Sequence, residues 1–223
     1  MSRLSGSWTW VLALLSTIAL PGGAFAFRSG PPPGRNGSTA SLGASCIGCH
    51  SAGVGESVEI LGVPTTYEAN TTYNLTVRIA DAAQAGAGFQ LSVEDDAGTH
   101  VGTLVITDAT NTQPNGGWVN HTFTGVDNSV TNWSGLGNSA EYNVDWVSPA
   151  SNVGAVTFWA AGNAINNDSS LNGDHVYLTN VSATFSLPVP AASTWGLVML
   201  TLLMIVGASV LLLRRQRTAR ISA

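Results

Sequence analysis

The sequence predicts an all-β domain, an antiparallel β-sandwich of about eight strands, set between two apolar terminal segments. Apolar and polar residues alternate with a period of two, as in Tyr73, Leu75, Val77 and Ile79, which is the pattern of a half-buried strand. Clusters of turn-forming residues, such as QPNGG at 113–117, separate the alternating runs. No segment of helical period and useful length lies between the apolar ends, which favours a sandwich over a mixed α/β fold.

The expected strands follow one another at short intervals along residues 56–187, the predicted sandwich domain. Most of them alternate, whereas the run VTFWA at 156–160 is mostly apolar and indicates a more fully buried strand. We expect strands near residues 56–61, 72–80, 88–94, 101–107, 117–124, 141–147, 154–161 and 175–186.

Residues 1–26 have the three parts of a secretory signal peptide. Arg3 supplies a positive charge, an apolar run extends from Trp8 to Leu20, and the residues Ala24 to Ala26 form a small-residue cleavage site. A buried N-terminal helix is the alternative, but it does not account for the cleavage site. The mature chain is therefore expected to begin at Phe27.

The C-terminal segment, residues 188–223, contains a predicted transmembrane helix at 195–213. This stretch carries no charge, and Arg214, Arg215 and two further arginines follow it, as on the cytoplasmic side of a single span. A buried core helix is the alternative. We therefore expect an exported domain, anchored to the cytoplasmic membrane and facing outward.

The same end of the chain carries a short motif before the apolar run. The sequence VPAASTWGLVML (189–200), followed by the span and by RRQR, resembles the C-terminal sorting signals of the PEP-CTERM and IPTL-CTERM class. The Trp195-Gly196 pair matches the Trp-Gly of the IPTL-type signal. The resemblance implies processing by an exosortase-like sorting enzyme in a bacterial envelope, with transfer to the outer surface after sorting.

The region between the two ends is strongly acidic. Residues 27–187 hold all thirteen acidic residues of the chain but only Arg28, Arg35 and Arg78 as cations, a formal charge of −10. Such a surface repels nucleic acid and anionic lipid headgroups. No nucleic-acid partner is therefore expected.

Residues 27–55 are expected to form an extended lead that carries the only two cysteines. Cys46 and Cys49 are followed directly by His50, which gives the motif C-x-x-C-H. This is the attachment signature of one c-type haem, whose vinyl groups form thioethers with the two sulfurs while the histidine is the proximal iron ligand. Export takes the chain to the compartment in which such attachment occurs.

Other interpretations of the cysteine pair stay open. A Cys46–Cys49 disulfide would cross-link the N-terminal lead. A thioredoxin-like redox pair needs a βαβ setting, which the sequence lacks. A zinc site needs further ligands from distant histidines. Chance spacing is the remaining alternative.

The residues that could be the sixth ligand of the haem iron can be narrowed by elimination. All three methionines lie in the terminal segments and the chain has no lysine, so only histidines remain, or an open position. His121, on an expected strand face with apolar neighbours, is the preferred distal ligand, and His175 is the less favoured one. A hydrogen-bonded core role is the alternative for His121. His100, at a turn, is interpreted as a solvated residue.

Several strand sequences carry a further resemblance. The segments GAGFQLSVEDDAGTHVGTL, WVNHTFTG, YNVDWVSPASNVGAVTFWAAGNAIN and GDHVY resemble the choice-of-anchor V family, itself related to the reeler domain. The match runs from about Cys46 to Phe185. It implies an immunoglobulin-like, reeler-like sandwich with a C-x-x-C-H motif near the mature N-terminus and a variable C-terminal anchor.

Two classes of function follow from these features. The first is an envelope-anchored, mono-haem, c-type cytochrome-like protein for electron transfer or redox sensing, with an unknown redox partner protein in the envelope. The second is a non-enzymatic surface binding or adhesion module in which Cys46 and Cys49 form a disulfide. No catalytic residue is predicted, since no Ser-His-Asp or paired-carboxylate signature is present. A redox enzyme is the third and less favoured class.

Overall fold

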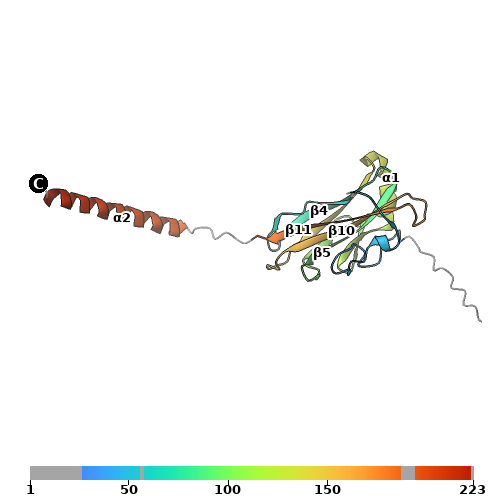
Figure 1. Cartoon of the computed structure of the whole chain (residues 1–223), viewed down its shortest axis with the longest axis horizontal. Coiled ribbons are helices and arrows are strands. Elements are labelled where there is room, and N and C mark those ends of the chain that lie inside the picture. The colour runs from blue at the N-terminus through green and yellow to red at the C-terminus, as the bar shows by residue number, and fades with distance from the viewer. Residues whose placement is uncertain (1–26, 56–57, 187–193, 222–223) are drawn as a thin grey trace, which may run out of the picture. The chain divides into compact units, whose positions relative to one another are not determined.

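The computed structural model describes residues 27–55, 58–186 and 194–221. The predicted signal peptide and residues 187–193, which include the start of the expected sorting motif, lie outside these ranges. The chain divides into two compact units, the first ending at Phe185 and the second beginning at Ser186. The first unit consists mainly of two β-sheets (Figure 1), so the predicted all-β sandwich is confirmed.

The larger sheet has seven strands and is antiparallel at its centre. Its order is β1 (Ser51–Ala52), β11 (His175–Phe185), β10 (Val156–Ile165), β5 (Gly86–Asp95), β8 (Trp118–His121) and β7 (Thr112–Asn115), and β3 (Thr66–Tyr67) also pairs with β11. The two short strands β1 and β3 run parallel to β11. The smaller sheet is antiparallel throughout, in the order β2 (Val58–Leu61), β4 (Thr72–Ala80), β9 (Ser139–Val147) and β6 (Thr103–Ile106).

The hydrophobic core lies between the two sheets, where the period-two alternation predicts it. Inward side chains of β4 and β9 are buried while their neighbours face outward. Phe89 of β5 stacks on Tyr142 of β9, with ring centroids 4.5 Å apart, and Trp146 meets Phe158 edge to face at 4.9 Å. Each such ring contributes about 1.5–3 kcal/mol through burial, so these pairs hold the sheets together.

The outer face of β5 is also buried, because the N-terminal lead covers it. Gln90, Ser92 and Glu94 point away from the core, yet all three are inaccessible to solvent. Each holds the lead by a hydrogen bond. The Gln90 amide donates to Pro32 O (2.9 Å), Ser92 accepts from the Asn36 amide (2.7 Å), and Glu94 accepts the backbone N–H of residue 40 (2.8 Å). The lead is therefore a fixed outer layer of the sandwich.

The expectation that no helix interrupts the strands was wrong. Helix α1 (Phe123–Asn132) follows β8 directly, so the strand expected at 117–124 ends at His121. Thr122 caps the helix by accepting the N–H of Gly125 at 2.9 Å. The segment is rich in Thr, Asn and Gly and has few apolar residues, so its helical period is too weak to recognise.

Three short strands were also missed, namely β1, β3 and β7. Strand β7 occupies part of the expected turn at 113–117 and contains Pro114, which an edge strand tolerates. The predicted strands near 72–80, 88–94, 141–147 and 175–186 correspond closely to β4, β5, β9 and β11.

The second unit contains helix α2 (Thr194–Ile221). Its segment Trp195–Leu212 has a mean hydropathy of 2.3 and no buried residue, so it is long and apolar enough to cross a membrane. The predicted apolar helix is confirmed, and such a helix can anchor a protein in a membrane.

Candidate functional site

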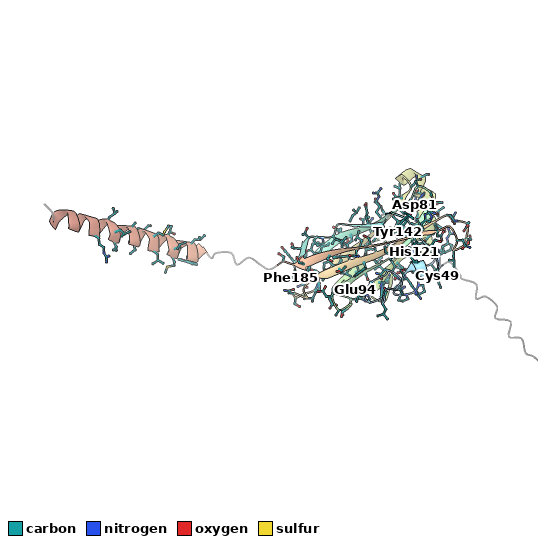
Figure 2. The ribbon with its side chains drawn as sticks, viewed as in Figure 1. Cys49, Asp81, Glu94, His121, Tyr142 and Phe185 are labelled. Carbon is teal, nitrogen blue, oxygen red and sulfur yellow. The ribbon has the colours of Figure 1, made fainter. Side chains whose placement is uncertain are left out.

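A cavity of about 370 Å³ opens at one end of the sandwich, between the lead and the larger sheet. Its wall is formed by the lead, by β5, β8, β10 and α1, and by the loop that joins β10 to β11. Figure 2 shows Cys49 and His121 at this end and Phe185 at the opposite end. The volume lies within the range of small-molecule and cofactor sites.

Both cysteines lie in the wall of this cavity. Cys46 begins a short 3₁₀ turn (Cys46–Gly48), and Cys49 follows the turn directly. Cys46 O accepts the backbone N–H of Cys49 and of His50, both at 3.0 Å. Arg35 O accepts the N–H of Cys46 at 3.1 Å, which ties the turn to the lead. Through this turn Cys46, Cys49 and His50 all line the cavity, and the Cys46 thiol lies 3.3 Å from Arg35 O.

The two thiols are free in the structure. Burial raises the pKa of the Cys46 thiol to about 11, and the nearby Arg35 guanidinium only partly opposes this shift. A thioredoxin-like pair needs the opposite, a lowered pKa that yields a thiolate at neutral pH. The environment of Cys46 is therefore not that of an activated redox thiol.

His50 is held in place by a buried carboxylate. Its Nδ1 lies 2.9 Å from Oδ2 of Asp174, whose side chain is 3% exposed. An ionised carboxylate only accepts hydrogen bonds, so Nδ1 carries the proton and Nε2 keeps its lone pair. Metal-binding histidines are commonly oriented in this way by a second residue. The amide of Asn163 contacts the same ring at 3.4–3.5 Å.

His121 also lines the cavity, but both of its ring nitrogens have backbone partners. Nδ1 lies 2.8 Å from the backbone N of Phe89, which can only donate, so Nδ1 accepts and the neutral ring carries its proton on Nε2. Nε2 faces Phe27 O at 3.4 Å. Burial lowers the pKa of His121 to about 4, which keeps the ring neutral. Ligation through Nε2 requires the other tautomer, with Nδ1 donating to Phe89 O at 3.1 Å.

The backbone beside His121 is shaped to accept its ring. A Cβ atom added at Gly88 would lie 2.5 Å from Cε1 and 2.6 Å from Nδ1 of the imidazole. Only glycine therefore lets β5 approach the ring this closely. His121 connects the lead, through Phe27, to strand β5.

The other two histidines lie outside this cavity wall. His175 Nδ1 is 2.7 Å from Oδ2 of Asp81, which also accepts the Tyr177 hydroxyl at 2.7 Å. Burial alone would raise the pKa of Asp81, but the hydrogen bonds from Tyr177, His175 and the backbone N–H of Ala83 together lower it. The expectation that His100 is a solvated turn residue was wrong, because its ring packs edge to face on Trp118 at 4.3 Å and its Nε2 is buried. The less favoured distal ligand, His175, is thus engaged in a separate polar cluster.

Sequence reasoning did not place several polar residues in the cavity wall, among them Arg28, Arg35, Asn163 and Asp174. The Nε of Arg28 and the Oδ1 of Asn163 are buried without a hydrogen-bond partner among the described residues. Unpaired buried polar atoms are costly, so they favour a ligand in the cavity. The arginines could have been singled out in the sequence, because the domain has so few cations. The contact of Asp174 with His50 could not, because no local sequence pattern connects the two residues.

The wall offers the parts that a c-type haem requires. Cys46, Cys49 and His50 line the same cavity, with the Asn163 amide 3.5 Å from Nε2 of His50, and Pro31, Pro32, Phe89 and Ile165 add apolar surface. No cluster of three or more His, Cys, Asp or Glu side chains that could hold a metal ion directly occurs in the described ranges. A haem iron needs only axial ligands, so the residues present fit that group.

Comparisons with known proteins give likenesses of fold only. No family model matches the chain, and no curated protein matches it. The crystal structure of the human F-spondin reeler domain (fragment 1) is 17% identical with a TM-score of 0.44, and covers 62% of this chain and 96% of its own. The Reelin-N domain of F-spondin is 18% identical with a TM-score of 0.43, and covers 64% and 96%. Function does not follow from likeness at this level.

Proposed function

We propose that residues 27–187 form an exported β-sandwich that binds one covalently attached haem in the cavity at its end. The observation that carries this proposal is that Cys46, Cys49 and His50 line one cavity of cofactor size. A motif that matched by chance, or that only stapled the chain terminus, would not need a cavity beside it.

The chain's residues have distinct roles in this proposal. Each cysteine S–H adds across one vinyl C=C, so that the sulfur bonds to one carbon and the hydrogen to the other, and no oxidant is consumed. Asp174 holds the Nδ1 proton of His50 and thereby directs the lone pair of Nε2 to the iron. Bound haem supplies a one-electron Fe(III)/Fe(II) couple. The partly open cavity gives a redox partner or a small ligand access to it.

The sixth position is expected to hold water or a small ligand rather than His121. The hydrogen bond from Phe89 N–H to Nδ1 leaves the proton on Nε2, where it blocks ligation. An open position favours redox sensing over simple electron transfer. Ferric spectra of the native domain and of His121→Ala test this: both should be high-spin. A low-spin native spectrum that becomes high-spin in His121→Ala would instead assign the distal ligand to His121.

The attachment itself is tested by producing the protein together with haem-attachment machinery. Haem held by thioethers should remain with the polypeptide on a denaturing gel. Cys46→Ser and Cys49→Ser should each weaken this retention, and the double variant should abolish it. Retention in the double variant, or loss of haem from the native protein on denaturation, would contradict covalent attachment.

A binding or adhesion module with a Cys46–Cys49 disulfide is the second candidate. The observation in its favour is that Leu42 and Val54, which flank the motif in the chain, are each 95% exposed. Exposed apolar side chains suit contact with a partner protein. This candidate requires a disulfide in the purified protein and no absorption band of haem.

We further propose that helix α2 tethers the domain to the cytoplasmic membrane of a bacterium, with the sandwich outside, and that the segment from residue 189 is a PEP/IPTL-type sorting signal of a choice-of-anchor V protein. The apolar, unburied segment Trp195–Leu212 supports the tether. Deleting residues 189–223 should release a soluble product into the periplasm or medium. If this truncated chain stayed in the membrane fraction, the proposed topology would be wrong.

A further inference from the structure

The cavity wall concentrates positive charge in a domain that has almost none. Residues 27–187 carry three arginines against thirteen acidic residues, and two of the three, Arg28 and Arg35, line this cavity. The third, Arg78, lies on β4 of the smaller sheet, 3.8 Å from Glu59 and 3.7 Å from Glu141. The wall also holds one carboxylate, Asp174, which is paired with His50, so the two arginines leave this cavity suited to an anionic group.

Arg28 is fixed in an orientation that leaves one donor free. Its guanidinium lies over the ring of Phe123, 5.1 Å from the centroid, and one Nη atom is paired with Asp127. Its Nε is buried and has no acceptor among the described residues. A guanidinium binds a carboxylate through two parallel N–H groups, so an acceptor at Nε would complete its hydrogen bonding.

Arg35 is available in a different way. Its backbone holds the cysteine turn through the bond from Cys46 N–H to Arg35 O. Its side chain makes no ion pair and no hydrogen bond with another described residue, although the surrounding domain is rich in carboxylates. Arg35 is exposed to solvent, so its guanidinium is available to an anionic group that enters the cavity.

We propose that Arg28 and Arg35 bind the two propionate carboxylates of the haem, and that they set the orientation of the porphyrin in the cavity. This inference rests on the proposed function, because haem is the ligand that carries both the vinyl groups for the cysteines and a pair of carboxylates. The cysteines and His50 would then determine attachment, and the two arginines would determine which edge of the ring enters the cavity.

The test compares two porphyrins that differ only at the carboxylates. The protein is the domain 27–187 with Cys46→Ser and Cys49→Ser, so that binding is reversible. The hydrophobic core is formed entirely by residues of the first unit, so this chain keeps the whole core. Binding of hemin and of hemin dimethyl ester is followed by quenching of tryptophan fluorescence at low salt.

We expect the domain to bind hemin ~10-fold or more tightly than the diester, as for a charge-assisted hydrogen bond. Arg28→Gln should remove most of this preference, Arg35→Gln a smaller part, and Arg28→Lys should retain some of it. Arg78→Gln is the matched control and should leave the preference unchanged. Asp127→Asn, which frees Arg28 from its ion pair, should increase the preference and does not depend on the stability of an arginine variant.

The outcomes separate the two proposals. Equal binding of both porphyrins, or an acid preference that survives in the Arg28→Gln, Arg35→Gln double variant, would overturn the role of the arginines while the haem site stands. Failure of the domain to bind either porphyrin, with its circular dichroism intact, would overturn the haem proposal and this inference with it.

Discussion

At the end of the sandwich where the chain leaves at Phe185, aromatic rings pack around Tyr67 and Trp146, whereas at the other end proline, arginine, cysteine and histidine surround a cavity. Tyr67 meets Trp146 at 5.5 Å and Phe185 at 5.3 Å, both edge to face, and neither Tyr67 nor Trp146 is exposed to solvent. The cavity end is held instead by hydrogen bonds of the lead. The comparison indicates that the aromatic end stabilises the fold and that the cavity end is free to bind.

The largest expected effect is on the aromatic end. Trp146→Ala removes a fully buried ring from the core and should lower the free energy of unfolding by about 3–5 kcal/mol. Urea unfolding of the 27–187 domain measures this loss. Trp159→Ala, at a half-buried position of β10, is the control and should cost less. An equal loss of unfolding free energy in Trp146→Ala and Trp159→Ala would contradict the view that the aromatic core stabilises the fold more than its outer face does.

The cavity end should show its own dependence on pH. Because His121 has a pKa of about 4 in the fold and 6.5 as its ordinary value, the unfolded chain binds more protons between these pH values. Stability is therefore full above pH 6.5 and falls as the pH drops toward 4, by about 3 kcal/mol. The pKa of Asp81 is lowered from 3.8, so its carboxylate stabilises the fold above that pH. This contribution is lost as the pH falls below 3.8.

This pH effect is measured by urea unfolding of the haem-free Cys46→Ser, Cys49→Ser domain at several pH values. His121→Gln should flatten the dependence between pH 4 and 6.5, and His100→Gln, at a partly exposed ring, should leave most of it. A native domain with constant stability across this window would show that His121 is not a buried neutral residue.

Detaching the lead should have a smaller effect and should spare the core. Glu94→Ala leaves the N–H of Ala40 and the hydroxyl of Ser92 without their acceptor, at a cost of about 1–3 kcal/mol. The amide of Ala40 should exchange faster with solvent while those of β4 stay protected. Glu141→Ala, which removes an exposed carboxylate, is the control. Uniform loss of protection would mean that the lead and the core unfold together.

The smallest effect is expected at the surface of the smaller sheet. Arg78→Ala breaks two long, exposed ion pairs and should change stability by less than about 1 kcal/mol. A thermal melt of the domain checks this. A loss of stability as large as that caused by Glu94→Ala would mean that Arg78, on the outer face of β4, helps to stabilise the fold.

The sequence was informative where neighbouring residues determine structure. Period-two alternation predicts β4 and β9 because each presents one face to the core and one to solvent. The same pattern is misleading on β5, whose outward residues Gln90 and Glu94 look solvated in the sequence but are buried under the lead. That contact joins residues more than fifty positions apart, so no local pattern records it.

The candidate site also combines residues that a local sequence pattern identifies with residues that come from distant parts of the chain. The spacing of the cysteines and His50 is local, and it identified one wall of the cavity. The partners of that wall come from distant parts of the chain: Asp174 reaches His50 from the loop before β11, and His121 is bonded to the backbone of β5. Because the sequence does not show where a ring nitrogen finds its partner, it could not separate a ligand from a hydrogen-bonded core residue at position 121.

The intact mass of the exported protein, produced together with haem-attachment machinery, tests the central claim most directly. The proposal predicts a mass equal to the mature polypeptide plus one haem, unchanged after denaturation, and equal to the bare polypeptide when both cysteines are serine. A native mass equal to the polypeptide minus two hydrogens would establish the Cys46–Cys49 disulfide and would contradict the haem site.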